Sequence, residues 1–236
     1  MAKSGNVLEE VVARLEAAYG RPEPPPVTDP LELILLENVA YLVGDEQRAK
    51  AFEALRERVG VRPESILSAP AAVLVEVARR GGVHAEKRAE RLREIALVAL
   101  EEFGGDLGGV LKLPPAQAKR ALKLFPAVGD PGAEKILLFT RSSPVLALDS
   151  NGLRVLIRLG FGEERKSYAA TYRSAQDAVR DYLREDYEWL IRTHQLLRRH
   201  GQELCRRSEP ACAACPLKSL CRYYQGVVAP GAGGRA

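Results

Sequence analysis

The feature that most constrains this chain is a short loop that holds all of its cysteines. Cys205, Cys212, Cys215 and Cys221 follow the spacing C-x6-C-x2-C-x5-C, and no other cysteine occurs in the 236 residues. Four thiols this close together pair as disulfides or share one metal centre. Which of these they do depends on the redox state of the compartment.

The N-terminal residues predict a reducing, cytoplasmic location. Glu9 and Glu10 interrupt the first twenty residues, so we expect no secretory signal, and no apolar run is long enough to cross a membrane. Thiols stay reduced in the cytosol, which disfavours disulfides. The net charge of +4 permits a nucleic-acid partner without demonstrating one.

The cysteine spacing bears on the kind of metal centre. Structural zinc sites usually pair two short C-x2-4-C knuckles, and here only Cys212 and Cys215 form one. Four thiolates with no histidine in the loop match a cubane 4Fe-4S cluster, which is larger than a single ion. We therefore predict an iron–sulfur cluster held by the four cysteines, with zinc as the alternative.

Helical periodicity dominates the rest of the chain and predicts an all-α fold. A proline-rich linker follows Gly20, and no segment alternates polar and apolar residues as a strand would. Asp29 is the expected N-cap of a buried helix over 30–43, and Ser68 of a later one. The remaining expected helices cover 8–20, 46–60, 70–82, 85–105, 114–125, 131–139 and three stretches between about 150 and 200.

The cysteine spacing, with Trp189-Leu190-Ile191 and His200-Gly201 upstream, resembles the endonuclease III family of DNA glycosylases. These belong to the helix-hairpin-helix superfamily. The resemblance implies two helical lobes with a DNA-binding groove between them, and a monomer that acts on double-stranded DNA in the cytoplasm, associated with the nucleoid. One lobe is a six-helix barrel with the hairpin, over 29–140. The other is an iron–sulfur cluster lobe over 1–28 and 141–225, and we expect a disordered tail over 226–236.

The segment LKLFPAVGDPGAEKI resembles the family's hairpin, L-P-G-V-G-x-K-T-A. A turn between two helices directs backbone N–H groups outward and suits a phosphate, although an ordinary helix–turn–helix packing unit is the alternative. Ala127 stands in place of the first hairpin glycine, so this position lacks glycine's freedom at positive φ. The resemblance implies these DNA-binding residues: Pro126, Ala127, Val128, Gly129 and Asp130.

Pro131 falls where bifunctional members of the family carry their catalytic lysine. That lysine attacks the sugar as an amine, which proline cannot do. Asp130 and Pro131 instead suit the N-cap and first turn of a helix. Lys135 lies one helical turn further on and is a weaker candidate for a displaced nucleophile, with a solvated lysine as the alternative.

The segment PVLALDSNGLRVLIRLG resembles the family pattern V-D-T-H-V-x-R. The resemblance implies that Asp149 is the catalytic aspartate and that Arg154 contacts DNA. Asn151 and Gly152 depart from the pattern. Alternatively, Asp149 serves only as the N-cap of a helix over 150–159. The two roles are compatible, because a capping carboxylate can also stabilise a developing positive charge.

Glu37 is a lone acid in an apolar helix and aligns with the catalytic glutamate of adenine glycosylases of the superfamily. If buried, it would have a raised pKa and act as a general acid. Alternatively, it lies at a solvated edge or pairs with an arginine. Leu42 falls where the family usually has a gap-filling glutamine. Val83 and His84 lie near the place of a pocket aromatic, and His84 reads as a surface helix-start residue.

These features favour a monofunctional DNA glycosylase of base-excision repair. The alternatives are a DNA-binding protein that has lost catalysis, and a bifunctional glycosylase/AP lyase with a displaced lysine. The chain ends soon after Cys221, so we expect it to lack the C-terminal domain with which adenine glycosylases inspect oxidised guanine.

Overall fold

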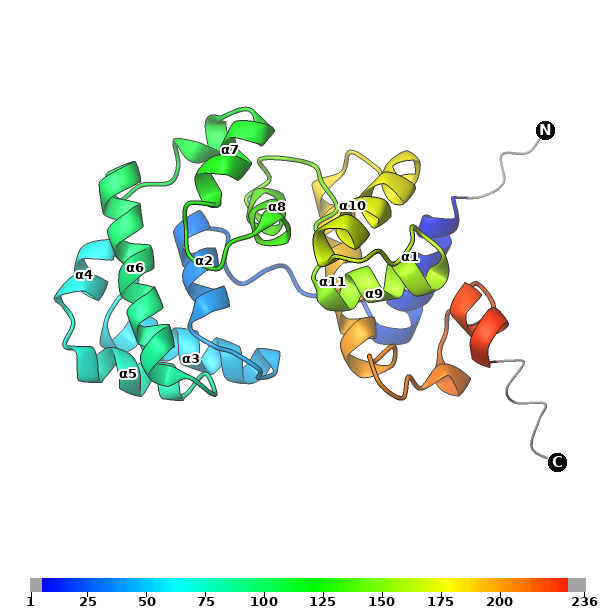
Figure 1. The fold of residues 1–236 in the computed structure, drawn as a ribbon, viewed down its shortest axis with the longest axis horizontal. Coiled ribbons are helices and arrows are strands. Elements are labelled where there is room, and N and C mark those ends of the chain that lie inside the picture. The colour runs from blue at the N-terminus through cyan, green and yellow to red at the C-terminus, as the bar shows by residue number, and fades with distance from the viewer. Residues whose placement is uncertain (1–5, 229–236) are drawn as a thin grey trace. The chain divides into compact units, whose positions relative to one another are not determined.

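The computed structural model describes residues 6–228, and helices dominate this range (Figure 1). Residues 6–228 contain no β-strand, and their one isolated bridge joins Tyr41 to Gly82. The predicted all-α fold class is therefore confirmed. Among the helices of these residues, none combines the length and apolar character needed to cross a membrane. The chain divides into two compact units, which we call the central unit (25–143) and the four-cysteine unit (1–24 with 144–236).

The central unit is built around a long helix, α6, which contacts α4 and α5, while α2 contacts α3, α6 and α8. Ile34 and Leu35 of α2 and Leu92 and Ile95 of α6 are fully buried in its core. Burying each such side chain stabilises the fold by roughly 1.5–3 kcal/mol. The elements are α2 (Pro30–Asn38), α3 (Asp45–Arg58), α4 (Pro63–Ser68), α5 (Ala71–Arg79), α6 (Ala85–Phe103), η1 (Val110–Lys112), α7 (Pro115–Leu122) and α8 (Asp130–Phe139).

Helix α2 begins as predicted and ends earlier than predicted. The carboxylate of Asp29 accepts a hydrogen bond from the Glu32 backbone N–H at 2.9 Å, which confirms the expected N-cap. The helix stops at Asn38, because the chain then turns to pair with another segment: the Tyr41 N–H donates to the Gly81 carbonyl at 2.8 Å. The apolar run after Asn38 is thus a loop and not the predicted end of the helix; periodicity cannot separate the two, because a short apolar run fits both structures.

Two other helix starts differ from the prediction by one or two residues. Ser68 is the last residue of α4 and caps nothing, whereas Pro70 takes the N-cap position of α5. Gly129, rather than Asp130, is the N-cap of α8, so Asp130 and Pro131 fall inside its first turn. Asp130 does not cap α8, because its carboxylate contacts Lys123 and Lys119 instead.

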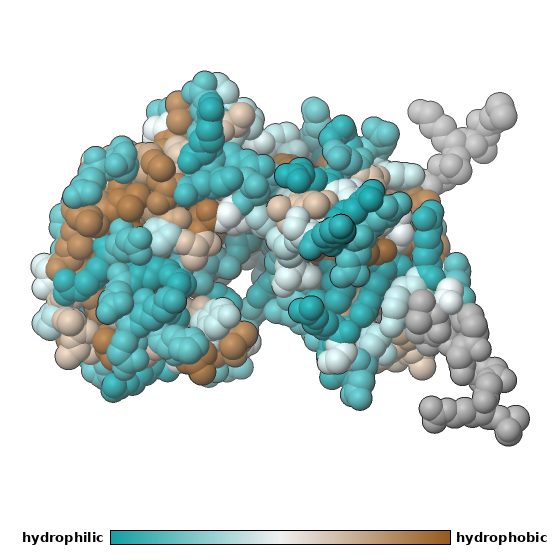
Figure 2. Space-filling view, in the orientation of Figure 1, coloured by the Kyte–Doolittle hydropathy of each residue, from teal (hydrophilic) through white to brown (hydrophobic). Residues whose placement is uncertain are grey.

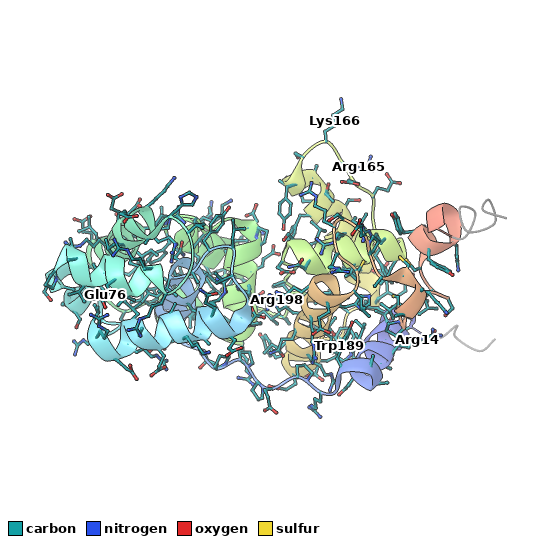
Figure 3. All side chains as sticks on the ribbon, turned by 90° about the horizontal axis from the view of Figure 1, so that it is seen from below. Arg14, Glu76, Arg165, Lys166, Trp189 and Arg198 are labelled. Carbon is teal, nitrogen blue, oxygen red and sulfur yellow. The ribbon has the colours of Figure 1, made fainter. Side chains whose placement is uncertain are left out.

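The four-cysteine unit joins the N-terminal helix α1 to the C-terminal helices, and α11 contacts both α1 and α9. Arg14, which extends from α1 (Figure 3), donates to the Ser219 hydroxyl at 2.7 Å. Gln195 of α11 donates to the Glu23 carbonyl at 2.8 Å. The elements are α1 (Val7–Tyr19), α9 (Ser150–Leu159), α10 (Tyr168–Val179), η2 (Arg180–Tyr182), α11 (Tyr187–Glu203), η3 (Cys212–Ala214) and the π-helical turn η4 (Tyr224–Val228).

Of the tail predicted to be disordered, residues 226–228 belong to the π-helical turn η4, and 229–236 lie outside the described residues. Hydrophilic side chains cover most of the visible face of the four-cysteine unit, whereas brown hydrophobic patches interrupt the visible face of the central unit (Figure 2).

Candidate functional site

The four cysteines line one cavity within the four-cysteine unit. Cys205 follows the end of α11, Cys212 begins η3, and Cys215 and Cys221 lie on either side of the next turns. All four side chains line this cavity, and all four cysteines are free thiols. The fold therefore brings all four predicted ligands to one place.

The donors that line the cavity fit the chemistry of an iron–sulfur cluster. Within residues 6–228, no group of three or more His, Cys, Asp or Glu side chains is arranged to hold a single metal ion. A tetrahedral zinc site would need four sulfurs about 2.3 Å from one point. Four thiols that line one cavity match the chemistry of a cubane cluster, whose four irons each take one thiolate. Val155, Leu159 and Leu217 supply apolar walls.

Donors from neighbouring helices approach the cysteine sulfurs. The Arg158 guanidinium of α9 donates to Cys205 Sγ at 3.3 Å and stacks over the Tyr223 ring at 4.6 Å. Burial raises the pKa of the Cys212 and Cys215 thiols, so in the absence of a metal they keep their protons. Metal binding would release those protons, since the thiolate is the ligand.

Asp149 is the N-cap of α9, which confirms one of the two roles predicted for it from the sequence. Its Oδ1 accepts hydrogen bonds from the backbone N–H groups of Asn151 (3.0 Å) and Gly152 (2.7 Å). Its Oδ2 accepts from the Asn151 side-chain amide at 3.0 Å and lies 3.4 Å from Nε of Arg198. The carboxylate is thus fixed on both oxygens, and its side chain remains 26% exposed. That exposure leaves it accessible to a ligand.

Sequence reasoning missed three residues around Asp149: Asn151, Arg198 and Tyr168. Arg198 projects from α11 (Figure 3), far from Asp149 in the chain, and no motif marks it. For Tyr168, partial burial and then the Asp149 charge raise the pKa of the hydroxyl. The departure at Asn151 from the family pattern was the one available signal.

Arg154, the predicted DNA contact, uses its donors within the protein. Its guanidinium donates to the Cys205 carbonyl (2.8 Å), the Gly201 carbonyl (2.7 Å) and Oδ1 of Asn151 (2.8 Å). Burial lowers the pKa of this guanidinium. In this structure, Arg154 joins the start of the cysteine loop to the residue that holds Asp149. Its predicted role on DNA stays a prediction.

The predicted hairpin joins α7 to α8 in the central unit. Phe125 is buried and stacks on Phe103 with the ring centroids 5.5 Å apart, which anchors the turn. Ala127 is exposed at the tip and has φ of 61°, so an alanine adopts the left-handed conformation that glycine favours. Within residues 6–228, no side chain caps the N-terminus of α8. Its first N–H groups are therefore available to an anion.

Asp130 brings a negative charge to this helix start. Its Oδ1 lies 2.9 Å from the Lys123 ammonium and 3.7 Å from that of Lys119, which also contacts Glu134 at 2.5 Å. Lys123 first, and then Lys119, hold the pKa of Asp130 below its usual value. The two lysines nearest the hairpin are thus already paired with acids of α8.

Glu37 and Lys135 form an ion pair with 2.7 Å between Oε1 and Nζ. The Glu37 side chain is 45% exposed, so it does not lie in the apolar pocket that would raise its pKa. The alternative of a solvated edge with a basic partner holds, with a lysine in place of the expected arginine. Lys135 is the more buried partner, at 16%.

Two loops of the central unit present apolar side chains to solvent. Leu42 is 77% exposed, and Tyr41 and Val83 are about half exposed. The buried Arg88 guanidinium holds both loops, because it donates to the carbonyls of Val39, Gly82 and Val83. His84 is exposed and precedes α6 in a left-handed conformation, which confirms it as a surface helix-start residue.

No family model matches this sequence, whereas individual proteins and solved structures do. The chain is 28% identical over 198 residues to an endonuclease III of Thermotoga maritima, covering 84% of this chain and 85% of that protein. It is 26% identical over 196 residues to a thymine-DNA glycosylase of Aeropyrum pernix, covering 83% of each.

A solved structure of a trapped endonuclease III–DNA covalent intermediate has a TM-score of 0.73 to this chain, with 20% identity over 95% of this chain and 98% of that one. This likeness shows the fold. Together, the comparisons confirm the resemblance predicted from the cysteine spacing: the chain is similar to endonuclease III in sequence, and to a solved endonuclease III in fold.

Proposed function

We propose that this chain is a monofunctional DNA glycosylase of base-excision repair. It would hydrolyse the N-glycosidic bond of a damaged or mismatched base in double-stranded DNA and leave the strand intact. The likeness to endonuclease III and to a thymine-DNA glycosylase supports the DNA substrate. One observation carries the monofunctional reading: a carboxylate is held in place at Asp149, whereas position 131 offers no amine.

Asp149 would stabilise the positive charge that develops on the sugar as the glycosidic bond breaks. Two backbone N–H groups and Asn151 fix its oxygens before the reaction, so little reorganisation is needed in the transition state. The exposed part of the carboxylate would also orient the attacking water. Asn151 and Arg198 act through Asp149 and are positioning residues in this scheme.

The contact between Lys135 and Glu37 argues against a displaced nucleophile. An amine attacks only as its free base, and Nζ of Lys135 lies 2.7 Å from Oε1 of Glu37 in an ion pair. Lys135 would have to leave Glu37 and deprotonate before it could form a Schiff base. We therefore propose that AP lyase activity is weak or absent.

Base extrusion would use the exposed loops of the central unit. Flipping a base out of the duplex leaves a gap in the stack, which an apolar side chain can fill. Leu42 is suited to this by its exposure. Glu37, which is 45% exposed and paired with Lys135, would accept a hydrogen bond from the leaving base rather than protonate it. Glu37 would exchange its contact with Lys135 for one with the base.

The hairpin and the cysteine loop would bind the DNA backbone and shape the fold. Within the predicted DNA-binding residues Pro126 to Asp130, the backbone N–H groups of Ala127, Gly129 and Asp130 would be offered to a phosphate. Pro126 has no N–H, and that of Val128 donates to the Phe125 carbonyl. The four cysteines would hold a 4Fe-4S cluster, which when bound orders the loop that carries Arg206 and Arg207. A monomer with a groove between two lobes stays a prediction.

A second function, DNA binding without catalysis, is favoured by one observation. Both oxygens of Asp149 already have partners within the chain, including Arg198 at 3.4 Å. A carboxylate with partners on both oxygens could have a purely structural role as the cap of α9.

One gel separates these functions. Purified protein is incubated with duplexes that carry oxidised pyrimidines, uracil, G·T or G·U mismatches, alkylated purines or an abasic site, and each sample is divided. We expect cleavage only in the half treated with hot alkali. Cleavage without alkali would show a lyase, and DNA binding without cleavage in either half would support the second function.

A further inference from the structure

A partly buried chain of contacts joins helix α1 to one of the four cysteines. Nε2 of His200 lies 3.5 Å from Cys215 Sγ, and Nδ1 of the same ring lies 2.8 Å from the Tyr19 hydroxyl. We propose that His200 donates a hydrogen bond to the cluster-bound thiolate of Cys215 and that Tyr19 sets the ring tautomer that makes this possible. The inference rests on the proposed cluster.

The chemistry of the three groups fixes the direction of each proton. A thiolate that binds iron has no proton, so Nε2 must supply the proton of the bond to sulfur. A neutral imidazole carries one N–H, so Nδ1 must then accept from the Tyr19 hydroxyl. The chain therefore runs from Tyr19 O–H to Nδ1, and from Nε2–H to Sγ. Both distances are compatible with this arrangement.

The surroundings hold this chain in place. His200 is only 1% exposed, and its carbonyl accepts from the N–H groups of Leu204 and Cys205 at 3.0 and 2.8 Å. The Arg199 guanidinium lies 4.9 Å above the Tyr19 ring and donates to the Tyr19 carbonyl at 3.1 Å. Helix α1 thus takes part in the cysteine site, although it lies at the other end of the sequence.

The expected consequence is a change in the reduction potential of the cluster. Hydrogen bonds to the sulfurs of an iron–sulfur cluster are among the factors that set its potential. An N–H donor stabilises the reduced cluster most, because that state carries more negative charge. Loss of the donor from His200 should therefore lower the potential.

The test uses the full chain purified with its cluster, and three variants: His200→Leu, His200→Gln and Tyr19→Phe. Iron content and absorbance are measured first, then the potential by voltammetry and the Fe–S stretching bands by Raman spectroscopy in H2O and D2O. We expect His200→Leu to lower the equilibrium constant for one-electron reduction of the cluster about tenfold. This corresponds to a fall in the reduction potential of about 59 mV. The variant should also lose the D2O sensitivity of the Fe–S bands.

The other variants separate hydrogen bonding from packing. His200→Gln keeps an N–H near the position of Nε2, so its potential should stay close to wild type. Tyr19→Phe keeps the aromatic ring but removes the hydroxyl that holds His200 in one tautomer. We therefore expect a smaller fall in the reduction potential than in His200→Leu. His194→Leu is the matched control, because His194 is equally buried on α11 and its Nδ1 contacts the Ala147 carbonyl at 2.8 Å. The reduction potential of the cluster in His194→Leu should not change.

The results distinguish this inference from the function proposed above. Wild-type protein without iron would overturn both the cluster and the role of His200. Normal iron content, with unchanged potentials in His200→Leu and Tyr19→Phe, would overturn the role of His200 alone. If His200→Leu fails to retain iron, the reduction potential of Tyr19→Phe tests the inference instead. This variant is expected to retain iron, since it removes only one oxygen from a half-buried side chain.

Discussion

Helices α8 and α9 begin in opposite ways. Helix α9 starts at Asp149, whose carboxylate accepts from two backbone N–H groups of the first turn. Helix α8 starts at Gly129, and no side chain among the described residues caps it. Its acid, Asp130, lies one residue later and contacts lysines of the α7 side instead.

The difference shows how one structural element can serve two tasks. A helix N-terminus attracts negative charge through its N–H groups and its dipole. At α9 the protein supplies that charge itself, which fixes a carboxylate in place. At α8 the N–H groups remain open to an anion from outside, such as a DNA phosphate.

The sharpest test of this contrast is Asp149→Asn. Asparagine caps helices about as well as aspartate, so the thermal unfolding midpoint should change little. The negative charge is lost, so we expect base release to fall on the order of 10²–10³-fold. Single-turnover assays with alkali treatment measure the rate. A variant with normal activity would leave Asp149 with a capping role only.

Pro131→Lys tests the other helix start. Position 131 lies in the first turn of α8, where a lysine can be accommodated, since proline there supplies no hydrogen bond. An amine at this position should give strand cleavage without alkali, which the wild type is expected to lack. Borohydride trapping of a protein–DNA adduct measures it. Lys135→Ala in the same background is the control and should not remove the new activity.

Asp130→Asn should strengthen DNA binding. The change frees Lys119 and Lys123 from Asp130 and removes a negative charge beside the proposed phosphate site. We expect a gain of about three- to tenfold at low salt, with a salt dependence steeper by about one counterion. Fluorescence anisotropy at several salt concentrations measures both. Asp177→Asn, which removes an exposed acid paired with Arg180, is the control and should leave affinity unchanged.

The smallest effect concerns the hairpin tip. Ala127 has φ of 61°, a conformation that costs an L-residue roughly 1–2 kcal/mol, whereas glycine adopts it freely. After the larger entropy loss of glycine on folding, Ala127→Gly should stabilise the protein by about 0.5–1 kcal/mol. Chemical denaturation measures it. Ala17→Gly, at an exposed site within α1, should instead destabilise by a similar amount.

The parts predicted best from sequence are those with local causes. The caps at Asp29 and Asp149 and the all-helical class follow from short patterns of residue types. The end of α2 could not be predicted, because it depends on pairing between Tyr41 and Gly81, which lie far apart in the chain. Arg198 beside Asp149 and Lys135 beside Glu37 escaped for the same reason: both contacts join separate helices.

The contacts of α1 bear on the order in which the chain folds during synthesis. The central unit is one continuous segment, so it can form as soon as that segment has left the ribosome. The four-cysteine unit cannot form this early, because the partner of Arg14, Ser219, is synthesised 205 residues later. Closing such a long loop is slow and entropically costly. Helix α1 therefore has to stay in solution without its partners while the rest of the chain is translated. Its charged residues favour contact with water during that time: Glu9, Glu10, Arg14 and Glu16.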